Sequence, residues 1–125
     1  MKQGAVEMKA ESKFVFIASM DVTPEREEDF GRVYDHEHIP NLLKVPGVRS
    51  AVRYRRRHFQ IVIGGELTSP SVSNEPQNTV IYEIDDPAVL ISPAWSQQVE
   101  VGRWPAEVRP FTSNRRHILL ERISS

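Results

Sequence analysis

Hydrophobic and polar residues along the chain alternate between strand-like and helix-like patterns in the order β-α-β-β-α-β. Residues 13–20 form a short apolar run, rich in aromatic and β-branched side chains, which predicts a strand buried on both faces. We also expect strands over residues 48–58, 79–84 and 115–123. This order predicts an α+β fold class, a ferredoxin-like βαββαβ unit with a four-stranded antiparallel sheet and both helices on one face.

The first helix has the clearest start in the chain. Thr23-Pro24 supplies an N-cap and a first-turn proline, and acidic residues follow in the first turn. Pro40 disfavours helical backbone at Ile39, so we expect the helix to break or kink there. A second helical region is predicted over residues 85–102 from its Asp, Ser and Pro starting signals, and Trp104 opens a further turn.

Residues 59–78 interrupt this pattern. Residues 59–63 either extend the second strand or begin an extra hairpin arm. Residues 64–78 are rich in Gly, Pro, Ser and Asn and predict a long loop. Residues 1–12 carry no clear pattern and predict a flexible leader, which leaves a single domain over residues 13–125.

The first predicted strand is apolar on both faces. One face carries Phe14, Phe16, Ala18 and Met20, and the other carries Val15 and Ile17. Two helices can cover only one of these sets. We therefore expect a homodimer in which two sheets face each other around a shared interior.

Composition excludes several classes of protein. The 125 residues include 16 Lys and Arg against 17 Asp and Glu, and no cysteine. Near-neutral charge argues against a general affinity for nucleic acid or membrane surfaces, and no apolar run approaches the roughly 18 residues of a membrane span. Without cysteine there is no disulfide, thiolate metal cluster or cysteine nucleophile. No secretory signal is visible, so we expect a cytoplasmic protein with no nucleic-acid and no membrane partner.

The densest cluster of candidate chemistry lies in residues 34–40. Imidazole and carboxyl groups there suit acid–base catalysis, and on a helix Tyr34 and His38 are i, i+4 neighbours. His36 and His38 point about 200° apart, which argues against a His-x-His metal pair, and no third ligand has suitable spacing, so we expect no metal site. His38 could instead be structural, capping the helix end or packing beneath Pro40.

Two further features have alternative interpretations. The run of arginines over residues 53–58 is basic with an aromatic residue interleaved, as in some nucleic-acid readers, but the neutral chain argues against that function. Arg53 could instead bind a carboxylate or enolate in an interior cleft. Trp95 and Trp104 belong to the core or a dimer interface, or form the apolar wall of a small-molecule pocket. No phosphate loop, nucleophile elbow or dinucleotide fingerprint is present.

The chain resembles the EthD-like branch of the dimeric α+β-barrel superfamily. The resemblance rests chiefly on Tyr34-Asp35-x-Glu37-His38-Ile39-Pro40, with Leu42-Leu43-x-Val45-Pro46-Gly47-Val48 and Ala51-x-Arg53-Tyr54 after it, and more weakly on Tyr82-Glu83-Ile84, Asp86-Pro87, Ser92-Pro93-Ala94 and Trp104. It covers most of residues 14–123. It implies a homodimer of ferredoxin-like subunits with a cleft between sheet and helices, and the motif histidine corresponds to His38. Relatives in the superfamily include cofactor-free cyclases and isomerases, quinol monooxygenases and haem-binding proteins.

Together these features give a hypothesis for function. We expect a small enzyme, without cofactor, that performs acid–base chemistry of isomerase, cyclase or degradative type on a hydrophobic carbonyl or lactone metabolite. His38 is the expected acid or base, Tyr34 orients it or donates to an enolate oxygen, and Arg53 supplies positive charge, with Trp95 and Trp104 against the substrate. The alternative is a non-catalytic homodimer that binds a small ligand or delivers it to a partner enzyme, and haem binding is a third possibility. The segment between the second and third strands is longer than the family's usual link and could cap the cleft or alter the dimer.

Overall fold

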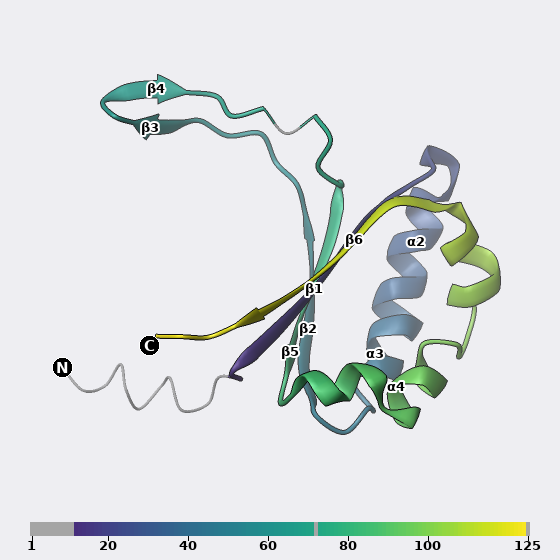
Figure 1. Cartoon of the computed structure of the whole chain (residues 1–125). Coiled ribbons are helices and arrows are strands. Elements are labelled where there is room, and N and C mark those ends of the chain that lie inside the picture. The colour runs from purple at the N-terminus through teal and green to yellow at the C-terminus, as the bar shows by residue number, and fades with distance from the viewer. Residues whose placement is uncertain (1–11, 72, 125) are drawn as a thin grey trace.

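The computed structural model places four antiparallel strands in one sheet, with the helices on one of its faces (Figure 1). Residues 12–71 and 73–124 are described. The strands of this sheet are β1 (Phe14–Val22), β2 (Val48–Arg55), β5 (Asn78–Ile84) and β6 (Thr112–Glu121), in the order β2-β5-β1-β6. Helical segments connect β1 to β2 and β5 to β6. The predicted α+β, ferredoxin-like βαββαβ fold is therefore confirmed.

Each helical connection is made of several short segments. The first consists of η1 (Pro24–Arg26), α2 (Glu27–Val33), η2 (Tyr34–His38) and α3 (Ile39–Leu42). The second consists of η3 (Pro87–Ile91), α4 (Pro93–Gln98), η4 (Trp104–Val108) and η5 (Arg109–Phe111). The core between these segments and the sheet is aromatic and aliphatic, and its most deeply buried side chains include Phe30, Tyr34, Leu42, Tyr82, Ile84 and Val108.

Side-chain caps begin the second connection, as its sequence predicts. The Asp86 carboxylate and the Ser92 hydroxyl accept backbone N–H hydrogen bonds at 2.8 and 3.1 Å. The predicted side-chain cap at Thr23 was wrong, because the Thr23 side chain makes no capping hydrogen bond. The helix begins there through a tight 3₁₀ turn in which the Arg26 N–H donates to the Thr23 carbonyl at 2.9 Å.

The helix passes through Pro40 by means of a π turn. In η2 the Ile39 N–H donates to the Tyr34 carbonyl, five residues back instead of four. A proline ring in a regular α-helix clashes with the carbonyl four residues back, and a wider turn removes that contact. The expectation of non-helical backbone at Ile39 was therefore wrong: its φ and ψ are −62° and −49°, and the helix continues into α3.

A second π turn has the same sequence spacing. In η4 the Arg109 N–H donates to the Trp104 carbonyl, and Pro110 follows at once. In both turns an aromatic residue stands six positions before a proline. The two turns contact one another across the helical layer.

The two faces of β1 separate as predicted. Ala18 and Met20 are buried beneath the helices, whereas Ile17 lies on the opposite face. The described helices all lie on one side of the sheet, so the opposite face is open (Figure 1). Cross-strand register adds to this open face the apolar side chains of Val15, Val52, Ile81, Ile118 and Leu120.

Residues 57–76, called the arm below, extend away from the sheet (Figure 1). In the arm β3 (Ile61–Ile63) pairs with β4 (Glu66–Thr68) around Gly64 and Gly65, whose φ values of 60° and 83° suit a two-residue hairpin turn. The hairpin alternative for residues 59–63 is thus confirmed. The predicted loop over residues 64–78 was wrong at residues 66–68, which pair with β3 as a strand, and at Asn78, which begins β5.

Of the leader predicted over residues 1–12, all but Ser12 lies outside the described residues, and Ser12 is buried. Across the described part of the chain no helix has the length and apolar character needed to cross a membrane.

Gly47, which precedes β2, packs closely against Val89 of the second connection, and substituting Gly47 tests this packing. Its φ is 96°, and a Cβ there would lie 2.5 Å from Val89 Cγ2. We expect Gly47→Ala to lower the free energy of unfolding by about 2–4 kcal/mol, through backbone strain and overpacking together. Urea denaturation measures this loss.

Gly64→Ala is the matched control, because Gly64 also has positive φ but a Cβ there meets nothing within 4 Å. Its loss should be about 1 kcal/mol, the backbone strain alone. Adding Val89→Ala to Gly47→Ala should recover part of the larger loss. Equal losses at the two glycines would contradict the packing explanation.

Candidate functional site

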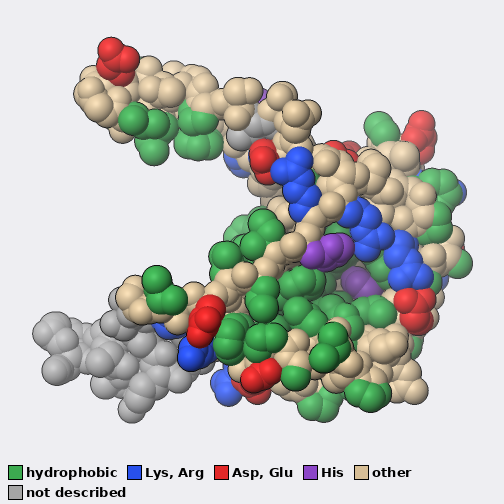
Figure 2. Space-filling model, viewed as in Figure 1, with side chains coloured by type: hydrophobic (Ala, Val, Ile, Leu, Met, Phe, Trp, Pro, Cys, Tyr) green, Lys and Arg blue, Asp and Glu red, His purple; other side chains and the backbone are tan. Residues whose placement is uncertain are grey.

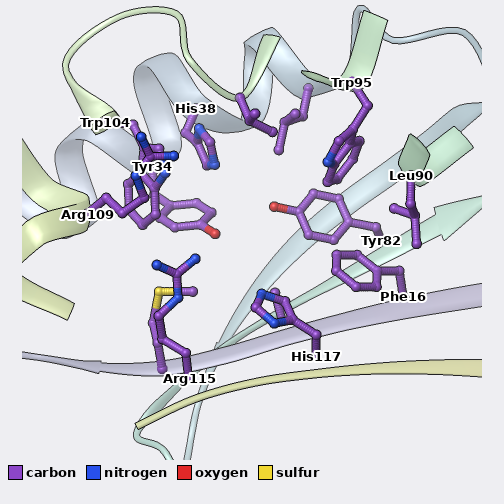
Figure 3. Close-up of a pocket in the computed structure, with 14 residues that line it drawn as sticks. Phe16, Tyr34, His38, Tyr82, Leu90, Trp95, Trp104, Arg109, Arg115 and His117 are labelled. Atoms are coloured by element: carbon purple, nitrogen blue, oxygen red, sulfur yellow. The ribbon is translucent and has the colours of Figure 1, made fainter. Parts of the chain in front are cut away.

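A cavity of about 310 Å³ lies between the sheet and the helical layer (Figure 3). Aromatic side chains of Phe16, Trp95 and Trp104 form much of its wall. In the space-filling view, histidine and hydrophobic side chains occupy this hollow and Lys or Arg side chains border it (Figure 2). The titratable residues that line it are Tyr34, His38, Tyr82, Arg109, Arg115 and His117.

His38 lies at the back of the cavity and is only 4% exposed. Its ring stacks on Trp104, with ring centroids 4.5 Å apart and planes at 22°, and meets the edge of Tyr34 at 4.9 Å. The ring points into the cavity (Figure 3), and its Nδ1 has no hydrogen-bond partner among the described residues. Burial, assisted by the charge of Arg109, lowers the pKa of His38 to about 4. The imidazole is therefore neutral near pH 7.

Two phenols face each other beside this imidazole. Tyr34 comes from the π turn and Tyr82 from β5, and their hydroxyls point toward one another (Figure 3). Burial raises the pKa of Tyr34 to about 12, against the smaller opposing effects of its hydrogen bond with Tyr82 and the charge of Arg115. Burial also raises the pKa of Tyr82 well above its ordinary value. Both hydroxyls therefore keep their protons and can donate to a ligand.

The acidic residues of the motif point away from the cavity. The Asp35 carboxylate accepts two hydrogen bonds from Arg53, at 2.8 and 3.0 Å, which lower the pKa of that carboxyl. Glu37 accepts the backbone N–H of Arg103 at 2.9 Å and its Nε at 2.7 Å, and these bonds lower its pKa. The two acids thus tie the helix to β2 and to the start of η4.

The structure brings most of the predicted site residues together. Tyr34, His38, Trp95 and Trp104 all line the one cavity. Arg53 does not: it lies outside the lining, held by the carboxylate described above.

Four titratable lining residues were not predicted, and β6 supplies two of them, Arg115 and His117. His117 lies opposite Ala18 in the register and stacks on Phe16 at 5.8 Å, so alternation turns Arg115 to the same face. Their spacing of two residues was a usable signal. The sequence did not reveal which face of the strand meets the helices.

The other two residues missed by the sequence reasoning are Tyr82 and Arg109. Tyr82 sat inside an apolar strand, where an aromatic residue indicates core packing. Arg109 lines the cavity, but the Glu100 carboxylate accepts two hydrogen bonds from its guanidinium, each 2.8 Å long. Among the described residues, no three His, Asp or Glu side chains gather in a way that could hold a metal ion.

Comparisons with known proteins bear on the fold. The structure is similar to the crystal structure of an ethyl tert-butyl ether D (EthD) family protein from Bacillus halodurans, with a TM-score of 0.55 and 17% sequence identity, over 88% of this chain and 99% of that one. The resemblance inferred from the residue motif is thus confirmed at the level of the fold. No protein-family model matches the sequence, and a search of curated proteins gave no match.

The neutral, buried His38 makes stability depend on pH. Its pKa falls from an ordinary 6.5 to about 4 on folding, so between these values the unfolded chain binds a proton that the folded protein does not. The free energy of unfolding therefore falls as the pH decreases through this window. When the pH falls from about 7.5 to 4.5, we expect the free energy of unfolding of the unsubstituted protein to decrease by roughly 2–3 kcal/mol more than that of His38→Gln. Urea denaturation at each pH measures the difference.

His36→Gln is the control for this experiment, because His36 lies on the same helical turn but is exposed. It should lose stability in parallel with the unsubstituted protein. If His38→Gln also follows that parallel course, His38 is not buried in its neutral form.

Proposed function

We propose that this protein is an acid–base enzyme acting on a hydrophobic carbonyl compound. The observation that carries the proposal is the neutral imidazole of His38, which points into an aromatic cavity beside the protonated hydroxyls of Tyr34 and Tyr82. A neutral base and a hydrogen-bond donor on one small cavity are what enolisation needs.

The proposed step is proton transfer at the carbon next to the carbonyl. A His38 nitrogen takes the proton, the C–H electron pair forms the new carbon–carbon double bond, and the carbonyl π electrons move to oxygen. The Tyr34 hydroxyl, with Tyr82 behind it, donates to the resulting enolate oxygen. Return of the proton to the same or a conjugated carbon completes an exchange or an isomerisation. Arg53 does not contact the ligand in this proposal, because Asp35 holds it outside the lining, although its charge still acts on the Tyr34 hydroxyl.

Burial holds the pKa of His38 near 4. A base this weak has a small driving force for proton removal, so the value favours the alternative of a ligand-binding protein without catalysis. An enolate beside the ring changes the balance, because a neighbouring negative charge raises the pKa of an imidazole. The two functions differ in whether a carbon–hydrogen bond is broken, and that is measurable.

Deuterium exchange tests the proposal without requiring a known product. The protein is incubated in D₂O with a panel of aryl ketones and lactones, and exchange at the carbon next to the carbonyl is followed by NMR. We expect at least one compound to exchange faster than in buffer, and His38→Gln to lower that acceleration by on the order of 10²–10⁴-fold.

His36→Gln, exposed on the same turn, should keep the full rate. Tyr34→Phe should lower the rate without abolishing it, since Tyr82 remains as a donor. A ligand that binds while its exchange stays at the buffer rate would leave the binding function in place and exclude the catalytic one.

We also propose that the chain forms a homodimer through the open face of the sheet. Val52, Ile118 and Leu120 on this face are 46%, 49% and 50% exposed. The arm adds exposed apolar side chains beyond β2, among them Val62 and Leu67, and hydrophobic side chains are visible along it in Figure 2. An exposed apolar sheet face of this kind is characteristic of a protein interface.

Light scattering after size exclusion tests the dimer. We expect a mass of twice the 14.3 kDa chain at micromolar concentration, and a monomer for Ile118→Glu, which places a charge in the interface. Ile91→Glu is the control, because Ile91 is 87% exposed on the helical side. A monomeric mass for the unsubstituted protein would contradict the interface.

A further inference from the structure

The cavity carries a positive charge that the described residues do not neutralise. No Asp or Glu of the described residues lines it. Of its two arginines, Arg109 is paired with Glu100 through two hydrogen bonds. Arg115 has no hydrogen bond or ion pair within the described part of the chain, and it is exposed where the cavity opens. An unmatched guanidinium on a concave surface is a site for an anion.

The position of Arg115 suits a ligand that also reaches the catalytic groups. Its guanidinium projects into the cavity below the Tyr34 hydroxyl and beside the His117 ring (Figure 3). Its charge acts on both of these groups, lowering the pKa of Tyr34 against burial and reinforcing the lowering that burial causes at His117. The neighbouring Arg116 faces the other way and binds Glu75 at 3.3 Å.

The rest of the lining selects for a flat, unsaturated ligand. Phe16, Tyr82 and Trp95 contact one another edge-on or tilted, with centroids 5.6 to 5.9 Å apart. Together with Trp104 and Tyr34 they surround the 310 Å³ cavity with aromatic faces and edges. A volume near the lower end of the usual range of about 300–1,000 Å³ for ligand pockets suits a compound of one or two rings.

We propose that the cavity binds an aromatic carboxylate, with the carboxylate accepting hydrogen bonds from Arg115 and the ring lying among the aromatic side chains. A guanidinium fork matches a carboxylate geometrically, and such charge-assisted bonds are stronger than neutral ones. This ligand class also narrows the substrate of the proposed function to an aryl carbonyl compound that bears a carboxylate. Only that catalytic step rests on the proposed function, since binding of the carboxylate does not require it.

Calorimetric titration with 3-acetylbenzoate and with its neutral analogue 3-acetylbenzamide tests the inference. The two probes have nearly the same shape and differ in charge. We expect the full-length protein to bind the carboxylate on the order of 10–100-fold more tightly than the amide, and Arg115→Gln to remove most of that preference with little effect on the amide. Arg115→Lys, which keeps the charge but not the fork, should restore part of it.

Arg116→Gln is the matched control, one residue away on the opposite face, and should keep the full preference. Equal affinities for the two probes, no binding of either at millimolar concentration, or a preference that survives Arg115→Gln would each overturn the inference. Deuterium exchange at the acetyl group of the bound probe separates the two proposals. Arg115-dependent preference without exchange overturns the catalytic function alone, whereas His38-dependent exchange of neutral ketones without that preference overturns the carboxylate alone.

Discussion

The two π turns set the position of every ring at the back of the cavity. A proline, Pro40 or Pro110, stands two residues after each turn, and returning either turn to a regular α-helix would press the proline ring against a backbone carbonyl. The turns contact one another, and Trp104 from one lies 4.5 Å from His38 and 5.0 Å from Tyr34 of the other. The positions of these three rings therefore depend on two segments in which a proline disfavours the regular α-helix.

Side chains of the motif around His38 point in two directions, because the motif is helical. Tyr34 and His38 turn inward to the cavity, while Asp35 and Glu37 turn outward to arginines on β2 and before η4. Half-exposed pairs of this kind contribute at most about 1 kcal/mol each to stability. Their value lies in orientation, because they fix the rotation of the helix about its axis and so the direction in which His38 points.

Local signals in the sequence predict local features well. Alternation in β1, the neighbourhood of Tyr34 and His38, and the caps of the second connection depend on residues close together in the chain, and each is found in the structure. The side-chain cap expected at Thr23 is the exception. The site also needs groups from β5 and β6, and their participation depends on strand register, in which a shift of one residue reverses the face. Arg115 could not be chosen over Arg116 for that reason. Arg53 was misplaced because its partner Asp35, 18 positions away, is on another element.

Hydrogen bonds hold the two ends of the arm together. The Arg56 N–H and guanidinium both donate to Gln77, at 2.9 Å each, and the Gln77 N–H donates to Asp21 at 2.8 Å. Since the ends already meet, the length of the segment between them changes the entropy of closure slowly, by about 0.6 kcal/mol for each doubling. None of the described residues of the arm lines the cavity. Because the junction itself closes the chain, the sheet and the cavity depend little on how many residues lie in the arm between its ends.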